Sequence, residues 1–300
     1  ASGLYVPFLN LPSDMDPAVA SRLKTDGLTA VANAISAYRK TLAFIEEDYA
    51  PNTRKGAGIA NLPGGKEVYA AAIEQHTAGA GYSPEEIHAL GEAEVARIRT
   101  EMEAILEEIH FEGDFKDFLT FLRTDPGFYA KTPEELMGRA KEIAAKLDAI
   151  LPDYFGKLPE HWYDAEPVPA AIAPGYTSGR YVEGDPEEDR PGIYLVNTYA
   201  LDQRPLYELP ALSAHEAVPG HHLQIMLAME MEGQPRFRQQ YYATAFGEGW
   251  GLYAEHLAME AGINETPYER FGGLSMEMWR ACRLVADTGM HWYGWSREEA

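Results

Sequence analysis

The sequence has 300 residues, which is enough for one large domain or two of ordinary size with a buried core. Its single cysteine, Cys282, excludes an internal disulfide and a zinc cluster made of cysteines. The formal net charge of −22 argues against nucleic acid and anionic membrane surfaces as partners, and no apolar run is long enough for a membrane span, so a soluble protein is expected.

Helical patterns fill the first half of the chain. Residues 17–50 carry apolar side chains at helical spacing, and the pattern stops at Pro51. Two further helix starts are marked by the same signal, a Ser or Thr followed by Pro-Glu-Glu, at Ser83–Glu86 and Thr132–Glu135. Residues 1–151 are therefore predicted to form an N-terminal helical region.

The composition changes over residues 152–205, which are richer in Pro, Gly, Tyr and Asp. Short runs of β-forming residues there predict strands at Ala170–Ala173, Arg180–Val182 and Gly192–Thr198. A small antiparallel sheet is the simplest arrangement of such strands. Helical spacing then returns, and residues 206–300 are predicted to form a second helical region. The expected fold is mainly α with a small antiparallel β-sheet (α+β), in one compact unit.

The segment His215–His222 reads His-Glu-Ala-Val-Pro-Gly-His-His and is the most informative part of the sequence. A His-Glu pair with another His shortly after it on a helix is typical of zinc peptidases, in which two imidazoles bind zinc and the glutamate, here Glu216, acts as general base. The second histidine usually stands at i+4, but Pro219 occupies that position. The candidates for the second ligand are His221 and His222. The alternative is a solvent-facing histidine cluster beside an ordinary turn.

Helix geometry constrains this assignment. On a regular helix His221 and His222 lie about 9 and 10.5 Å further along the axis than His215, too far for a shared metal ion. Pro219 cannot donate to the helical hydrogen bonds, and Gly220 tolerates the dihedral angles of a break. We therefore expect the helix to be interrupted at this Pro-Gly pair and to resume as a regular helix near His222.

A third metal ligand is predicted at Glu248, because zinc with two histidines commonly takes a carboxylate as well. Glycines surround this residue in the segment Gly247–Glu255 and predict a close approach of its helix to the histidines. Glu255, two helical turns further along the same side, would hold a ligand histidine in place. The alternative is that both acids are solvated surface residues.

The last helical pattern, from Thr266 to Tyr293, places Arg280, Arg283 and His291 on one polar side. In a zinc hydrolase His291 would donate to the oxyanion, and Arg280 or Arg283 would bind a substrate carboxylate. The alternative is a solvated helix face without a function of its own.

The strand at Gly192–Thr198 is a candidate for substrate binding. Metallopeptidases often hold a peptide as an added strand on an exposed sheet edge, and Asn197 would then hydrogen-bond the substrate backbone. The alternative is an internal strand that packs Ile193 and Leu195 into the core. None of the 18 tyrosines is singled out by the sequence as a phenolic donor.

These segments resemble the bacterial domain-of-unknown-function 885 family, which is grouped with the gluzincin zinc metallopeptidases. Glu248 matches the zinc-binding glutamate of the aminopeptidase N group in that clan, and Gly220-His221 matches the Gly-His pair that ends the zinc motif of angiotensin-converting enzyme. The second match favours His221 over His222 as a ligand. The resemblance covers nearly the whole chain and rests on five segments: Ser83–His88, Arg190–Asn197, His215–Gln224, Glu248–Glu255 and Asp287–His291.

The resemblance implies a gluzincin-like architecture and a zinc-dependent peptidase that acts on short peptides, with zinc held by His215, His221 and Glu248 in the catalytic region 206–300. His222 is expected to point away from the metal, toward a carboxylate or a substrate subsite. Two other functions stay open: a metal-dependent hydrolase of another amide or ester, and a catalytically inactive helical binding module.

A further expectation concerns the ends of the chain and the place where the protein works. Ser296–Glu299 is a helix-start signal one residue before the last, and members of the family that the chain resembles extend past both ends. A longer natural protein, or a second polypeptide that completes the fold, is therefore expected. The compartment is left open between the bacterial cytoplasm and the periplasm or cell envelope.

Overall fold

Helices carry most of the fold in the computed structural model, and the chain divides into two units, residues 1–57 and 58–300. The structure describes residues 3–54, 56–235, 237–238 and 241–300.

The first unit is built on one long helix. It contains α1 (Val6–Leu9) and α2 (Pro17–Phe44), and α2 continues through irregular helical turns to Asn52, as the apolar pattern predicts. The side chain of Asp16 caps α2, because it accepts hydrogen bonds from the first free N–H groups of the helix. Gly27 is the position where the ring of Phe8 packs onto the helix, since a Cβ there would lie 2.7 Å from the ring.

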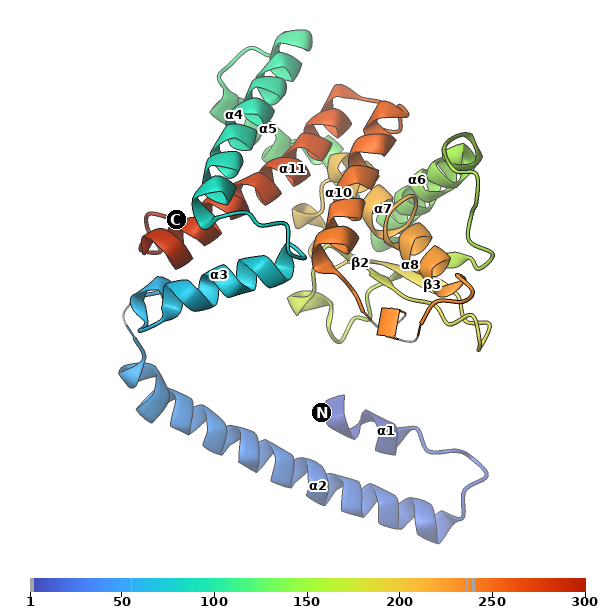
Figure 1. Ribbon diagram of the computed structural model, residues 1–300. Helices are drawn as coiled ribbons and strands as arrows, with labels where there is room; N and C mark the ends of the chain where they lie inside the picture. Colours follow the sequence, from blue (N-terminus) through green and yellow to red (C-terminus); the bar gives the residue numbers. More distant parts are fainter. Residues whose placement is uncertain (1–2, 55, 236, 239–240) are drawn as a thin grey trace. The chain divides into compact units, whose positions relative to one another are not determined.

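The second unit contains the remaining long helices and the sheet (Figure 1). The Ser83 signal forms a complete capping box, whereas Thr132 caps its helix while the Glu135 carboxylate accepts from the N–H of Lys131. The helices of this unit are α3 (Gly65–His76), α4 (Pro84–Glu108), α5 (Phe115–Thr124), α6 (Pro133–Tyr154), α7 (Leu209–Glu216), α8 (His221–Met229), α10 (Thr244–Glu260) and α11 (Pro267–Thr288).

The sheet has three strands, β1 (Tyr163–Pro167), β2 (Gly179–Val182) and β3 (Gly192–Val196), in the order β1-β3-β2. β1 runs parallel to β3 and β2 runs antiparallel to it, so the sheet is mixed and the predicted antiparallel sheet is wrong in this respect. The residues Ala170–Ala173, predicted as a strand, form a turn instead. In this turn the N–H of Ile172 donates a hydrogen bond to the carbonyl oxygen of Pro169.

The strand that the sequence did not reveal is β1. It reads Tyr-Asp-Ala-Glu-Pro, which has no β-branched residue and ends in proline. It lies at the edge of the sheet, where acidic side chains reach solvent and a proline is tolerated. The pairing with β3 therefore holds this segment in a strand, although its own residues do not favour one.

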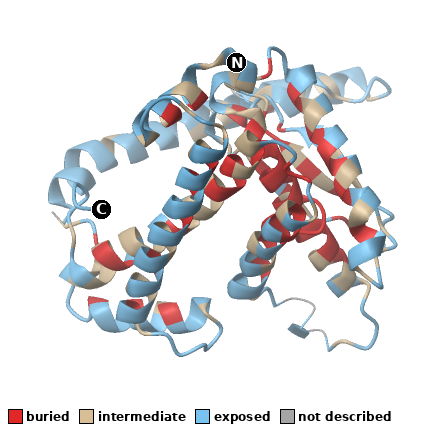
Figure 2. Cartoon of the chain, turned by 90° about the horizontal axis from the view of Figure 1, so that it is seen from above, coloured by how far each residue is buried: buried red, intermediate tan, exposed pale blue. Residues whose placement is uncertain are grey.

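Two apolar clusters hold the second unit together, and Figure 2 shows the buried residues gathered in its interior. One joins α6, β3 and α7, with Leu147, Tyr194 and Ala214 fully buried. The other joins α4, α5 and α11 around Phe118 and Phe271. α7 packs against α6, α10 and α11, so it is buried on nearly every side.

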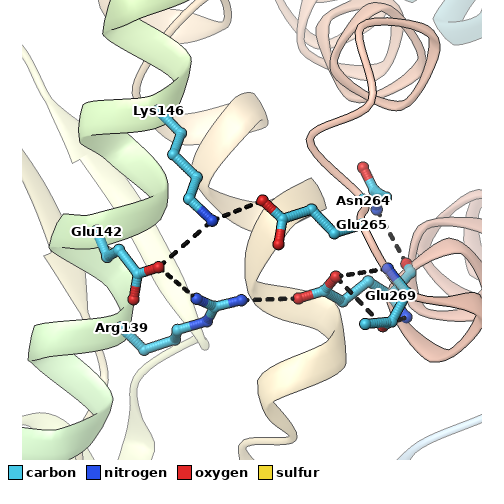
Figure 3. Close-up of polar contacts among 7 residues, drawn as sticks. Arg139, Glu142, Lys146, Asn264, Glu265 and Glu269 are labelled. Atoms are coloured by element: carbon cyan, nitrogen blue, oxygen red, sulfur yellow. Dashed lines mark hydrogen bonds and ion pairs between the residues drawn. The ribbon is translucent and has the colours of Figure 1, made fainter.

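Charged residues fasten the start of α11 to α6 (Figure 3). Arg139 binds Glu269 at 3.0 Å, and Lys146 binds Glu265 at 2.6 Å, while Glu142 contacts both bases. Glu269 is also the capping-box residue of α11, so one carboxylate orients the helix and anchors it.

The helices that the structure describes include none with the length and apolar character that a membrane crossing requires.

Candidate metal centre

Three side chains from three helices converge on one point. His215 lies near the end of α7, His221 opens α8, and Glu248 lies in the second turn of α10. Nε2 of His215 is 3.6 Å from one Glu248 oxygen, and Nε2 of His221 is 3.8 Å from the other. One ligand atom from each residue lies within 4.8 Å of the other two. Two ligands of a tetrahedral zinc ion lie about 3.4 Å apart, so the two His–Glu separations are close to what a zinc ion between these residues requires.

The two histidines meet because the helix is interrupted, as the Pro-Gly pair predicts. α7 ends at Glu216 and α8 begins at His221. Across the break the N–H of His222 bonds to the carbonyl of Ala217 at 3.0 Å, in place of the i→i+4 pattern. Gly220 is required there, since a Cβ would lie 1.9 Å from the carbonyl oxygen of His215.

The approach of α10 to α7 also depends on a glycine. A Cβ on Gly251 would lie 2.5 Å from the imidazole of His215, so only glycine lets the helix backbone pack on this ring. Gly249 has no such neighbour, because nothing lies within 4 Å of its Cβ position. The predicted close approach is therefore confirmed at residue 251 and does not explain residue 249.

The far side of His215 is held by an acid and a base. Its Nδ1 lies 2.7 Å from Oε1 of Glu255, which is 4% exposed. Arg280 of α11 binds the same carboxylate at 2.8 Å. Because a carboxylate only accepts, Nδ1 carries a hydrogen, and Nε2 is the nitrogen that faces Glu248 and would bind a metal once its own proton is lost. This is the arrangement that fixes metal-binding histidines in proteins.

The electrostatics of the cluster favour a cation. Burial lowers the pKa of His215, but Glu248 and Glu255 outweigh it and raise the pKa to about 9. Burial and the neighbouring His215 lower the pKa of His221, which keeps its imidazole neutral. The contact with His215 lowers the pKa of Glu248. A carboxylate and a neutral imidazole thus surround a position where positive charge is stabilised.

The second histidine has a matching partner on its own helix. Nδ1 of His221 and Oε1 of Gln224 are both buried, and neither has a hydrogen-bond partner among the described residues. The two residues are three positions apart on α8, so their side chains are neighbours. An Nδ1–H donor and an amide oxygen acceptor are complementary, and a hydrogen bond between them would leave Nε2 of His221 free for a metal.

Glu216, the residue proposed from the sequence as general base, lies beside the cluster. Its Oε2 accepts a hydrogen bond from the backbone N–H of Tyr181 at 2.7 Å. Burial raises its pKa, and the opposing effects of His215 and of the Tyr181 N–H do not cancel this. A carboxylate that is partly desolvated and oriented on one oxygen is suited to accept a proton on the other.

His222 points away from the cluster, but its partners differ from the carboxylate or subsite that we expected. Nδ1 lies 3.0 Å from the hydroxyl of Tyr181, and Nε2 lies 3.2 Å from the carbonyl of His161. Burial lowers the pKa of His222 to about 4, so this imidazole is neutral.

One residue near the cluster was missed from the sequence. A Cβ on Gly247 would lie 1.9 Å from the hydroxyl of Tyr242, so this glycine makes room for the phenol beside Glu248. The pKa of Tyr242 is raised by burial and then by Glu248 and Glu216. Its hydroxyl therefore lies close to the start of α10, within electrostatic range of both carboxylates. The residue precedes α10 in an irregular segment, and no sequence pattern distinguishes it from the other tyrosines.

Asn197 is placed elsewhere, and its expected role is corrected. It is 0% exposed, and its amide nitrogen donates to three carbonyls of the loop 173–177. Its Oδ1 accepts from the N–H of Tyr199. No hydrogen-bonding group is left for a substrate, and β3 is the central strand, so it offers no free edge. Asn197 therefore ties the loop before β2 to the end of β3.

The residues expected to bind substrate or oxyanion from the last helix are also distributed differently. Arg280 is engaged with Glu255, so its guanidinium supports the cluster. Arg283 is exposed and stacks on the ring of Trp279 at 5.1 Å. His291 lies about 16 Å further along the helix axis than Arg280.

His291 has its own partners at that end of the unit. Its Nδ1 accepts from the N–H of Ile59 at 3.1 Å, its ring stacks on Tyr69, and its Nε2 lies 3.8 Å from Asp287. The structure does not bring it to the metal cluster.

Comparison with known proteins places the chain in a family. The family model described as a bacterial protein of unknown function (DUF885) matches residues 2–300. No curated protein matches the sequence. Among solved structures, the crystal structure of the putative lipoprotein from Colwellia psychrerythraea is similar, with a TM-score of 0.89 and 29% sequence identity. The similarity covers 98% of this chain and 51% of that one, so the chain spans about half the length of that protein.

Proposed function

The chain belongs to the bacterial DUF885 family, whose function is unknown, and we propose that it is a zinc-dependent peptidase that hydrolyses short peptides. The observation that carries the proposal is the convergence of His215, His221 and Glu248, with Glu255 on the far nitrogen of His215. Two imidazoles and one carboxylate are the donors of catalytic zinc sites that keep a fourth position for water. The likeness of these motifs to those of gluzincin peptidases supports the reaction class.

Each residue around the cluster has its own role in hydrolysis of the peptide bond. When bound, zinc supplies a Lewis acid that makes water more acidic and polarises the scissile carbonyl. Glu216 takes the proton from the attacking water and passes it to the departing amine. The hydroxyl of Tyr242 donates a hydrogen bond to the negative charge that develops on the substrate carbonyl oxygen. Glu255 and Arg280 keep the ring of His215 in place throughout.

The edge of β2 is the surface that supports binding of a peptide. The N–H of Asn197 bonds to the carbonyl of Ser178, and this register turns alternate residues of β2 toward β3. The backbone groups of Gly179 and Tyr181 therefore face the other way, next to Glu216. A substrate added there as a further strand would bond to the backbone of Gly179 and pass the general base, since the N–H of Tyr181 is already bound to Glu216.

The alternative is a metal-dependent hydrolase of another amide or an ester, because the same residues would serve that chemistry. A panel of short peptides assayed against small acyl amides and esters separates the two. We also propose that the protein acts in the cell envelope, and the likeness to the putative lipoprotein supports this over the cytoplasm. Fractionation of the bacterial cell tests the location.

The mechanism is tested by Glu216→Gln. This variant should keep the zinc content of the wild type, measured by elemental analysis, because Glu216 is not a ligand. Its kcat should fall by about 10²–10⁴, the usual contribution of a general base. Glu260→Gln, at the exposed end of α10, is the matched control and should cleave peptides normally. Zinc-free wild type that is fully active, or normal turnover by the Glu216→Gln variant, would remove the proposal.

A further inference from the structure

The histidine next to the second proposed ligand contacts the sheet. His222 is 3% exposed, and its Nε2 lies 3.2 Å from the carbonyl oxygen of His161. Because a carbonyl oxygen only accepts, Nε2 carries the hydrogen, and Nδ1 accepts from the hydroxyl of Tyr181 at 3.0 Å. Partners on both nitrogens therefore fix the orientation and the tautomer of this ring.

Further contacts hold this histidine and its partner in place. The carboxylate of Glu230, just after α8, accepts from the N–H groups of Glu160 and His161, so the loop that carries the acceptor carbonyl is itself tied to α8. Gly192 leaves space for the phenol, since a Cβ there would lie 2.4 Å from the Tyr181 hydroxyl.

Tyr181 carries the contact from His222 to the proposed general base. Its side chain binds His222, and its backbone N–H donates to Oε2 of Glu216 at 2.7 Å. Tyr181 is 7% exposed and lies on an edge strand, so no other strand competes for this N–H among the described residues. One residue thus joins the His222 ring and the Glu216 carboxylate through two separate groups.

We propose that His222 is a positioning residue that orients Glu216 through Tyr181, an inference that rests on the proposed function. His222 fixes the Tyr181 side chain and with it the place of the N–H that holds Oε2. The other oxygen of Glu216 then keeps one orientation toward the attacking water. The two adjacent histidines therefore have different roles: His221 would bind the metal, and His222 orients the general base.

Two variants test this role in the zinc-loaded protein. Tyr181→Phe removes only the hydroxyl, and His222→Phe keeps a ring of similar size without its nitrogens. Both should lower kcat about tenfold, a part of what a general base contributes, while KM and zinc content change by less than about twofold. Tyr163→Phe is the matched control, because its ring also packs on His222 but its hydroxyl binds Asp148. It should turn over like the wild type.

Amide exchange gives a readout that does not depend on activity. The N–H of Tyr181 should exchange at least about tenfold faster in His222→Phe and in Glu216→Ala than in the wild type, and at the wild-type rate in Tyr163→Phe. Unchanged kcat in both variants of an active enzyme, or unchanged exchange in His222→Phe, overturns the positioning role and leaves the peptidase proposal standing. A wild type without zinc or peptidase activity refutes the proposed function, and the exchange rates then still decide whether His222 controls the contact with Glu216.

Discussion

Nδ1 of His215 lies 2.7 Å from Oε1 of Glu255, and both side chains are almost completely buried. This contact orients the ring so that Nε2 of His215 faces Glu248. Glu255→Ala should therefore lower zinc affinity about 10- to 100-fold, the usual cost of losing such a partner. Competition with a chromogenic chelator measures the change. Glu260→Ala on the same helix, whose exposed carboxylate pairs with His256, should bind zinc like the wild type.

Arg280 and Arg283 lie on the same helix, and the same substitution should affect protein stability differently at the two positions. Arg280 binds the buried Glu255, so Arg280→Met should destabilise the zinc-free protein by about 2 kcal/mol, since it leaves His215 as the remaining partner of this buried carboxylate. Arg283 is exposed on Trp279, and Arg283→Met should change stability by less than about 0.5 kcal/mol. Urea unfolding in the presence of a chelator gives both values. Equal losses would show that the Arg280–Glu255 contact contributes little.

Local rules predicted the parts of the site that depend on local geometry. A Pro-Gly pair cannot continue a helix, and this was enough to predict the break that brings His215 and His221 together. The cap at Ser83 follows in the same way from neighbouring residues. The spacing of glycines before Glu255 likewise indicated the close approach found at Gly251.

The parts that failed depend on residues far apart in the sequence. β1 is a strand because β3 pairs with it, and its own residues give no strand signal. The Tyr242 hydroxyl lies within electrostatic range of Glu248 only because α10 carries Gly247 opposite it. Asn197 looked available for a substrate, yet the loop before β2 takes up its amide. The polar face of the last helix correctly indicated that Arg280 lies on the side of the metal cluster. It could not reveal that Arg280 is bound to Glu255.

Two glycines on α10 give opposite predictions for the same substitution. In Gly251→Ala the new Cβ would lie 2.5 Å from the His215 ring, so the ring must move and zinc binding should fall by at least about tenfold. In Gly249→Ala nothing lies within 4 Å, and the gain in helix propensity should stabilise the protein by about 0.5–1 kcal/mol. Zinc titration and urea unfolding of both variants provide the test. Similar zinc affinities in the two variants would contradict the packing of α10 on His215.

The last prediction concerns Glu208, which directly precedes α7. Burial raises the pKa of Glu208 to about 7, and Arg204 only partly opposes this. In the unfolded chain a glutamate has a pKa of about 4.3, so the folded state binds this proton more tightly. The resulting stabilisation is fully present below about pH 4.3 and is lost as the pH rises to about 7, with a magnitude on the order of 3 kcal/mol. Glu208→Gln removes the titrating group while it keeps the shape of the side chain. The difference in unfolding free energy between wild type and this variant, measured in urea from pH 4.5 to 7.5, should therefore shift against the wild type as the pH rises. A difference that stays constant over this range would show that the Glu208 carboxyl is not desolvated in the folded protein.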